Sequence, residues 1–393
     1  MDLNYSDDQV MLRESAERYL REKHPFEHFR RVEAAGAAFD AETWGAFSHL
    51  GWLGLPISEA HGGLGGGAIE TAIVAEMLGS ALVLEPFVPA VVLAGGLVDQ
   101  LGSEAQCAEL LGPLVEGSGC LAFAHDEQAA GYDLSRLDAK ATRAGKGWRI
   151  DGCKTTVLGG PAAKSFLVTA RSSERAVGAE GIGIFIVPAS SSGVSVKPFR
   201  TAEGGVAADV QFSGVSASSS ALLGANEDAS CAVRQALDRA AAASCWDAVG
   251  AMDALLAATV DFTKQRVQFG KPLSNLQTLQ HRMAEMAVKC NEARAIALLA
   301  SLSLDAPEHM RVRGVSAAKA KIGRVSRHVA HEAIQLHGAM GFSDELPVGW
   351  WFKRLFVFEN LFGSTSYHLE RYRALIGQPS VQAESLLRPP VMT

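Results

Sequence analysis

Two segments in the second half of the chain carry residue types that bind a phosphorylated ligand with a flat ring. The first runs from Arg266 to Pro272 and reads Arg-Val-Gln-Phe-Gly-Lys-Pro. Its arginine can chelate a phosphate, and Phe269 can cover a ring. The second, Gln335 to Phe342, has two glycines three residues apart near a helix end, where the backbone can approach a ligand. Each segment alone also fits a plain connection between helices, capped by a glycine.

Three stretches of the chain differ in their pattern of apolar residues, and they must position these segments. Residues 1 to 118 show helical spacing of apolar residues, with Ser6 as the first N-cap. Residues 119 to 225 consist of short β-prone runs punctuated by Gly, Ser and Pro, which predicts a small antiparallel β domain. Residues 226 to 393 are helical again, and a heptad seam from Leu279 to Leu304 predicts a helix in a bundle. The sequence therefore predicts three domains with these bounds and an α+β fold.

The overall composition is that of an ordinary globular protein. Of its 393 residues, 48% are hydrophobic and 20% charged, which fits two or three folded domains. A formal net charge of −7 argues against bulk binding to nucleic acid. The six cysteines form no CxxC pair, and we see neither a signal peptide nor an apolar run of membrane-spanning length. A soluble cytoplasmic protein is expected.

Two other motifs favour structural roles. The glycine-rich run from Gly63 to Ala68 lacks the preceding strand and the βαβ unit of a dinucleotide-binding fold, so we interpret it as a loop before a helix. The spacing of His328, His331 and His337 does not match a metal-binding helix. No metal site is expected.

Taken together and in this order, the two segments resemble the acyl-CoA dehydrogenase family, and the resemblance covers almost the whole chain. It implies an N-terminal helical domain, a central antiparallel β domain and a C-terminal four-helix bundle, which enclose FAD and an acyl-CoA thioester. The resemblance also implies that Arg266 and Phe269 hold the FAD diphosphate and adenine of a neighbouring subunit. Gln335 and Gly338 match residues that contact the FAD of that neighbour.

The same comparison reveals three departures from the family pattern. Asp126 replaces a threonine that contacts the flavin in the family. We predict that Asp126 also contacts the flavin, although its negative charge would repel a flavin hydroquinone anion. In the next strand, Thr156 replaces a ring-stacking tryptophan, and Leu158 replaces the threonine that partners the flavin N5. Phe362 stands where most members have the glutamate that removes the substrate α-proton. A phenyl ring cannot accept that proton.

The resemblance offers a replacement for the missing base. Some members carry the base on an earlier bundle helix, in a Glu-Arg dipeptide that Asp238-Arg239 matches here. Asp238 is therefore the predicted catalytic base. An aspartate reaches about 1 Å less than a glutamate, a displacement that can cost about 10²-fold in rate. The alternative is a solvated acid that pairs with Arg239 or Arg234.

Two functions follow from the resemblance. The first is an FAD-dependent acyl-CoA dehydrogenase that desaturates an acyl-CoA thioester and passes electrons to an electron-transferring flavoprotein. The second is a catalytically deficient partner subunit that completes the FAD site of a heteromeric acyl-CoA dehydrogenase. The second fits the pattern of losses, which resembles the small subunit of two-component enzymes acting on dicarboxylyl or ring-bearing substrates. Both functions imply a homo- or hetero-oligomer, either a dimer or a tetramer.

Overall fold

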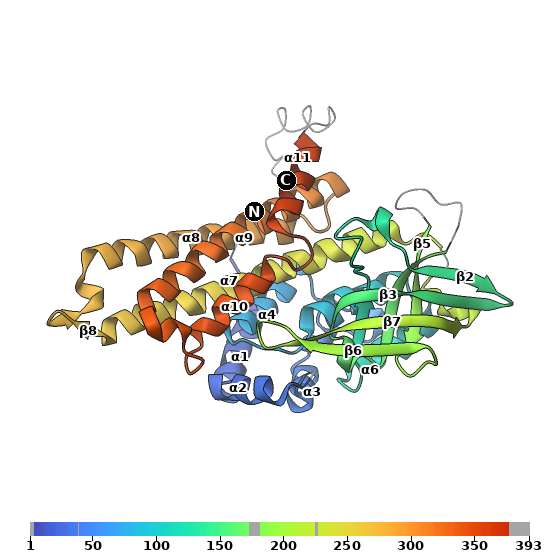
Figure 1. The fold of residues 1–393 in the computed structure, drawn as a ribbon, viewed down its shortest axis with the longest axis horizontal. Helices are drawn as coiled ribbons and strands as arrows, with labels where there is room; N and C mark the ends of the chain where they lie inside the picture. The colour runs from blue at the N-terminus through green and yellow to red at the C-terminus, as the bar shows by residue number, and fades with distance from the viewer. Residues whose placement is uncertain (1–3, 38, 173–180, 225–226, 377–393) are drawn as a thin grey trace.

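A computed structural model describes residues 4–37, 39–172, 181–224 and 227–376 of the chain. The sheet formed by the middle of the sequence lies at one end of the molecule, and the long helices of the C-terminal part extend away from it (Figure 1). This confirms the predicted α+β fold and its helix–sheet–helix order. The predicted third domain extends to residue 393, and residues 377–393 lie outside the described residues. None of the described helices is long and apolar enough to span a lipid bilayer.

The N-terminal part is built from short helices that pack around a common core. The first begins with a capping box, in which Ser6 Oγ accepts a hydrogen bond from Gln9 N at 3.3 Å and Gln9 Oε1 accepts one from Ser6 N at 3.0 Å. The predicted N-cap is therefore confirmed. The elements are α1 (Asp7–Lys23), α2 (Phe26–Ala35), α3 (Ala41–His49), η1 (Trp52–Gly54), η2 (Glu59–His61), α4 (Ala68–Ser80), η3 (Phe87–Gly95), α5 (Gly96–Leu101) and α6 (Glu104–Val115).

The central part forms one twisted sheet of seven strands. Its main path runs β1-β4-β2-β3-β7-β6, and β5 pairs with β4. Most pairs are antiparallel as predicted, but β4 pairs in parallel with β1 and, through one residue pair, with β2. The long stretch between β1 and β4 makes these parallel pairs possible, because a tight hairpin cannot. The elements are β1 (Leu121–Ala124), η4 (Leu134–Arg136), β2 (Lys140–Ala144), β3 (Gly147–Leu158), η5 (Gly160–Ala162), β4 (Ser165–Arg171), β5 (Ile182–Pro188), β6 (Val194–Arg200), β7 (Val206–Ala217) and η6 (Ser219–Ala221).

The C-terminal part is a bundle whose three longest helices lie side by side (Figure 1). The predicted heptad seam lies on α8, and its members Met283, Cys290 and Ala297 are buried against α7 and α9, which confirms the prediction. The elements are α7 (Ser230–Gln265), β8 (Val267–Gln268), β9 (Lys271–Pro272), η7 (Leu273–Asn275), α8 (Gln277–Leu302), α9 (Glu308–His337), η8 (Gly338–Phe342), α10 (Val348–Phe358) and α11 (Thr365–Ile376).

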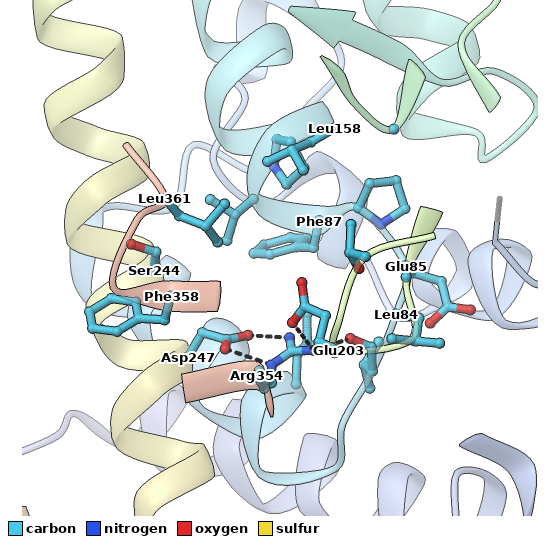
Figure 2. A pocket seen from close by; sticks show the side chains of 18 of the residues that line it. Leu84, Glu85, Phe87, Leu158, Glu203, Ser244, Asp247, Arg354, Phe358 and Leu361 are labelled. Atoms are coloured by element: carbon cyan, nitrogen blue, oxygen red, sulfur yellow. Dashed lines mark hydrogen bonds and ion pairs between the residues drawn. The ribbon is translucent and has the colours of Figure 1, made fainter. Parts of the chain in front are cut away.

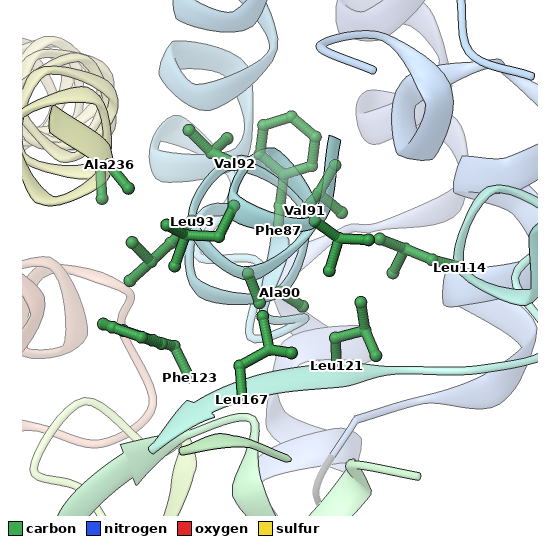
Figure 3. Packing of buried hydrophobic residues seen from close by; sticks show 14 of the residues in the cluster. Phe87, Ala90, Val91, Val92, Leu93, Leu114, Leu121, Phe123, Leu167 and Ala236 are labelled. Carbon is green, nitrogen blue, oxygen red and sulfur yellow. The ribbon is translucent and has the colours of Figure 1, made fainter. Parts of the chain in front are cut away.

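The π-helical segment η3 joins the three parts into one core. Figure 3 shows its side chains between Leu121 of β1, Leu167 of β4, Leu114 of α6 and Ala236 of α7. Because η3 is apolar on almost every side, it can be surrounded by neighbours, and most of its residues are buried. The sheet and the bundle are therefore held at a fixed distance from each other.

Helices α4 and α7 approach each other unusually closely. A Cβ atom on Gly79 would lie 2.0 Å from the carbonyl oxygen of Asp247, and one on Gly250 would lie 1.8 Å from that of Glu76. Only glycine fits at these two positions. The crossing is bordered by Glu76, a buried carboxylate that accepts two hydrogen bonds of 2.9 Å from Arg294 of α8.

A second bidentate ion pair ties α10 to α7. The Arg354 guanidinium donates to both carboxylate oxygens of Asp247, at 2.8 and 2.6 Å, and to the carbonyl of Val83 at 2.9 Å. Both charged side chains are largely buried, so little water competes for these bonds. The pair therefore fixes the start of the turn that follows α10.

We expect Asp247→Ala to lower the free energy of unfolding by about 3 kcal/mol, because the change leaves the Arg354 cation largely buried without its closest partner. The exposed pair of Arg239 with Asp305 is the matched control, since Asp305 is 78% exposed. Asp305→Ala should cost less than about 0.5 kcal/mol. Urea unfolding followed by circular dichroism measures both variants. Equal losses would contradict the role given to the Arg354 pair.

Candidate functional site

The turn between α10 and α11 carries Phe362 at the point where the bundle meets the sheet. Phe362 has φ 54° and Gly363 has φ 113°, so the backbone reverses sharply here, with a non-glycine residue in the left-handed region. The phenyl ring is half-buried and packs against the cores of both the N-terminal part and the bundle. Phe362 is therefore held at a definite place between the domains.

Buried polar groups hold the carbonyls of this turn. His368 Nε2 lies 3.0 Å from the Phe362 carbonyl oxygen, and its Nδ1 lies 3.3 Å from Ser316 Oγ. Burial lowers the pKa of His368 to about 4, so the ring is neutral at pH 7 and Nε2–H donates to the carbonyl. Lys319 Nζ donates to the Phe358 carbonyl at 2.8 Å, and burial lowers its pKa to about 8. These bonds fix the turn that carries Phe362.

One cavity that includes Phe362 in its lining lies where the N-terminal part, the sheet and the bundle meet, and we call it the Arg354 cavity. Figure 2 shows an upper wall of Phe87, Leu158 and Leu361 and a lower side that carries Arg354 and its acidic partners. The enclosed volume is about 110 Å³, space for several water molecules. Its lining combines apolar side chains with one charged cluster, as ligand pockets do.

Acidic groups outnumber cations at this cavity. Arg354 pairs with Asp247 and also lies 3.5 Å from Glu203, whose pKa is raised by burial in spite of the nearby guanidinium. Glu85 also lines the cavity; its Oε1 accepts a hydrogen bond from Asp40 N at 3.2 Å, while its buried Oε2 has no partner among the described residues. Burial raises the pKa of Glu85 to about 7. A carboxyl group that is half protonated near neutral pH thus lies beside the cavity.

A second cavity also includes Phe362 in its lining, and we call it the Asp238 cavity. It encloses about 300 Å³. Its lining contains the sequence-predicted residues Asp126 and Asp238 together. The remaining lining residues are His125, Tyr132, Asp133, Leu134, Arg234, Leu237, Phe362, Tyr367 and Arg371.

The contacts of Asp238 disfavour the role of base that the sequence suggested. Its side chain is 1% exposed and lies between two guanidinium groups. Arg311 Nε donates to Oδ2 at 3.1 Å, and Arg371 donates to both oxygens, with Nη2 to Oδ2 at 3.0 Å. Arg239, one of the two partners suggested by the sequence, turns away to Asp305 at 2.6 Å. Both oxygens of the Asp238 carboxylate are thus occupied by guanidinium donors, and neither is left free to face a substrate.

Asp126 occupies the mouth of the same cavity. Much of the residue is exposed, yet protein atoms crowd its carboxyl group, and this desolvation raises its pKa to about 6 while the Lys154 cation lowers it. Its segment is fixed by a neighbouring buried pair, in which Lys154 Nζ donates to Glu127 Oε1 at 2.7 Å. Glu127 in turn accepts backbone N–H bonds from Asp138 and Ala139. Sequence reasoning missed this pair and Arg354. Arg354 lies in an otherwise mostly apolar run, which could have indicated a buried charge, whereas the residues around Glu127 and Lys154 are polar and gave no such signal.

The other two departures lie at the end of β3. Thr156 has φ 53° and is exposed, and the ladder between β3 and β7 shifts its register between Lys154 and Val157. A β-branched residue in the left-handed region is strained and here forms part of a bulge. The bulge directs the half-buried Leu158 into the lining of the Arg354 cavity. The side chain that Leu158 offers there has no hydrogen-bonding group.

The remaining predicted residues lie at the far end of the bundle, at the β8–β9 hairpin (Figure 1). Phe269 and Gly270 form its two-residue loop with φ 55° and 76°, as a type I′ turn requires, and Phe269 is 88% exposed. Arg266 ends α7 beside them, and among the described residues no acid pairs with its exposed guanidinium. This end also holds the C-terminus of α9, because Phe262 and His337 stack 4.4 Å apart.

Gln335 and Gly338 therefore share the end of the bundle with Arg266 and Phe269. Gly338 has φ 61°, and a Cβ atom there would meet no atom within 4 Å, so the backbone is open to solvent. We call these four residues the tip site. The structure thus divides the predicted residues into two groups, the tip site and the pair Asp126 and Asp238, which line one cavity.

The chain matches three domains of one family along its length. It matches the N-terminal domain of acyl-CoA dehydrogenase over residues 6–118, the middle domain over residues 122–215 and the C-terminal domain over residues 231–375. A probable acyl-CoA dehydrogenase of Bacillus subtilis, YngJ, is 29% identical over 355 residues, which cover 88% of this chain and 92% of YngJ.

Solved structures show the same similarity. The butyryl-CoA dehydrogenase of Megasphaera elsdenii superposes with a TM-score of 0.89 at 26% identity, over 96% of this chain and 100% of that one. A variant of the Tcur3481-Tcur3483 steroid ACAD superposes with a TM-score of 0.85, also at 26% identity, over 95% of this chain and 99% of that one. These similarities extend over all three parts of the fold.

Asp238→Asn should lower the free energy of unfolding by about 2 kcal/mol, because it removes the charge that Arg311 and Arg371 share. The turnover rate of an active preparation should not change when it is divided by the amount of folded, flavin-containing protein. Asp133→Asn, an exposed acid at the same cavity, is the control for both quantities. Loss of turnover with normal stability would instead restore Asp238 as the base.

The raised pKa of Glu85 predicts a pH-dependent stability. Between the unfolded value near 4.5 and the folded value of about 7, the native state binds more protons than the unfolded state, so stability falls as pH rises. Glu85→Gln removes this loss, and we expect the variant to gain about 2 kcal/mol over wild type between pH 5 and pH 8. Urea unfolding at several pH values measures it, with the exposed Glu109→Gln as control. A constant difference between variant and wild type contradicts the assignment.

Proposed function

This chain belongs to the acyl-CoA dehydrogenase family, and on that premise we propose that it is a partner subunit of a heteromeric acyl-CoA dehydrogenase. In this proposal its tip site completes the FAD site of a neighbouring chain. The neighbour supplies the base that removes the substrate α-proton. The reaction of the assembly is the α,β-desaturation of an acyl-CoA thioester.

The observation that carries the proposal is the contrast between two groups of residues that lie at opposite ends of one helix. Asp238 lies near the start of α7, and Arg266 follows its last residue. At about 1.5 Å per residue, the intervening helix is roughly 40 Å long. A single FAD molecule does not bridge that distance. The tip site therefore serves a different flavin from any held beside Asp126.

The tip site fits the diphosphate and adenine of FAD. Arg266 offers an exposed guanidinium that can bind a diphosphate through paired hydrogen bonds. Phe269 offers an exposed ring in a backbone conformation fixed by its hairpin, and Gly338 is exposed with open space where a side chain would stand, so a ligand can approach the backbone closely there. The exposed ring and the exposed cation stand close enough together to contact one ligand.

The residues around Phe362 do not fit a flavin of this chain's own. Leu158 has no donor for a ring nitrogen, and Phe362 has no group that accepts a proton. Asp126 sets a carboxyl group, half ionised near pH 6, at the position of a neutral hydroxyl. Asp238 is bound to two arginines. We derive no chemical step at this site.

The chain's own part in catalysis is then binding and positioning. FAD, when bound, accepts the hydride equivalent that leaves the β-carbon of the substrate. Arg266 neutralises the diphosphate, and Phe269 covers the adenine and keeps water from it. Support for a heteromer comes from the similar Tcur3481-Tcur3483 steroid ACAD, which is named as a pair of chains. Transfer of electrons to an electron-transferring flavoprotein belongs to the same proposal.

The self-sufficient acyl-CoA dehydrogenase is the competing function, and one experiment separates the two. The chain is purified alone and together with a neighbouring dehydrogenase-like chain, and the visible flavin spectrum and acyl-CoA-dependent dye reduction are measured. We expect flavin and activity only in the joint preparation. Bound flavin with turnover by the chain alone would overturn the proposal.

Arg266→Ala should weaken FAD retention in the joint preparation by about 10- to 100-fold, which corresponds to one charge-assisted contact. Lys264→Ala is the matched control, since Lys264 is an exposed cation two residues before Arg266. FAD content after dilution and gel filtration measures both. Unchanged retention in the Arg266 variant would remove the tip site from the proposal.

A further inference from the structure

Phe362 forms a wall between two cavities. Among the described residues, it is the one that belongs to the linings of both the Arg354 cavity and the Asp238 cavity. The first encloses about 110 Å³ and the second about 300 Å³. In the described part of the chain, Phe362 is therefore the one residue through which both cavities are bounded.

The position of this side chain is imposed by the turn that carries it. The left-handed φ of Phe362 is strained for a residue with a Cβ atom, and it persists because His368 and Lys319 hold the adjacent carbonyls. A Cβ atom on Gly363 would lie 2.5 Å from His368 Nε2, so a side chain at this position would collide with the histidine ring. The backbone of Phe362 is consequently held in place between the residues that line the two cavities.

The two cavities have complementary linings for an amphipathic ligand. The Asp238 cavity carries Arg234 and Arg371 together with two tyrosines. The Arg354 cavity has an apolar wall that includes Leu78, Phe87 and Leu361, in addition to the charged cluster of Arg354 and its acidic partners. A ligand with a polar head and an apolar chain fits across both, with its chain passing the position of the phenyl ring.

We propose that Phe362 is a steric plug that divides one acyl-sized channel and excludes acyl chains from this subunit. The inference rests on the proposed function only in the choice of ligand, an acyl thioester. It gives Phe362 a role beyond the loss of a base. A subunit without a base that still bound substrate would hold it unproductively, in competition with the catalytic chain.

Removal of the ring should join the cavities and allow an acyl chain to enter. We expect Phe362→Ala to bind octanoyl-CoA about tenfold or more tightly than wild type, measured by isothermal titration calorimetry on the chain as purified. Free CoA, which lacks the acyl chain, should bind both proteins equally. Phe356→Ala is the matched control, because Phe356 is 62% exposed and lines neither cavity.

Three outcomes would overturn the plug. Tighter binding of octanoyl-CoA than of CoA by wild type shows that the channel is already open. The absence of a gain in Phe362→Ala shows that other residues close it, and an equal gain for CoA shows that the acyl chain is not the group admitted. Phe362→Gly, which relieves the strain at the positive φ, replaces the alanine variant if that variant fails to fold. This experiment measures acyl-CoA binding, whereas the proposed function is tested by FAD retention in the joint preparation. The two proposals can therefore fail independently.

Discussion

The close crossing of α4 and α7 is the constraint on which the rest of the structure depends. Gly79 and Gly250 bring the two backbones so near that no other residue fits at either position. The crossing sets the place of Asp247 on α7, and Asp247 binds Arg354 of α10. Through Arg354 the crossing also fixes the beginning of the turn that carries Phe362. A backbone contact in the core is thus transmitted to the candidate site by one ion pair.

Helix α7 then determines what the candidate site can do. It carries Asp238 and Asp247 near the sheet and ends beside Arg266, so one rigid element joins two regions roughly 40 Å apart. Near the sheet, Leu158 and Phe362 offer no hydrogen-bonding or proton-accepting group, while the tip carries an exposed cation and an exposed ring. Because the helix does not bend the two regions together, the proposed assembly uses them at two different flavin sites. The proposal of a partner subunit rests on the contrast between the regions: the groups near the sheet do not suit a flavin, whereas those at the tip do.

The sequence predicted local patterns well and distant partners poorly. The heptad seam and the capping box at Ser6 were readable because their partners lie within a few turns of the same helix. The sequence offered Arg239 or Arg234 as partners of Asp238, whereas its actual partners, Arg311 and Arg371, are 73 and 133 residues away. The parallel pairing of β1 with β4 was missed for the same reason, since strand neighbours far apart in sequence leave no periodic signal.

The turn at Phe362 is held rigidly although Phe362 cannot accept a proton. Its strained φ, its buried lysine and its neutral histidine are costly features that a simple connection between two helices does not need. They remain although the residue they position cannot take a proton. The proposed steric role of Phe362, which lines both the Arg354 cavity and the Asp238 cavity, gives this rigidity a physical purpose. The same rigidity that would align a base also holds a phenyl ring in a narrow passage, where it acts by its volume.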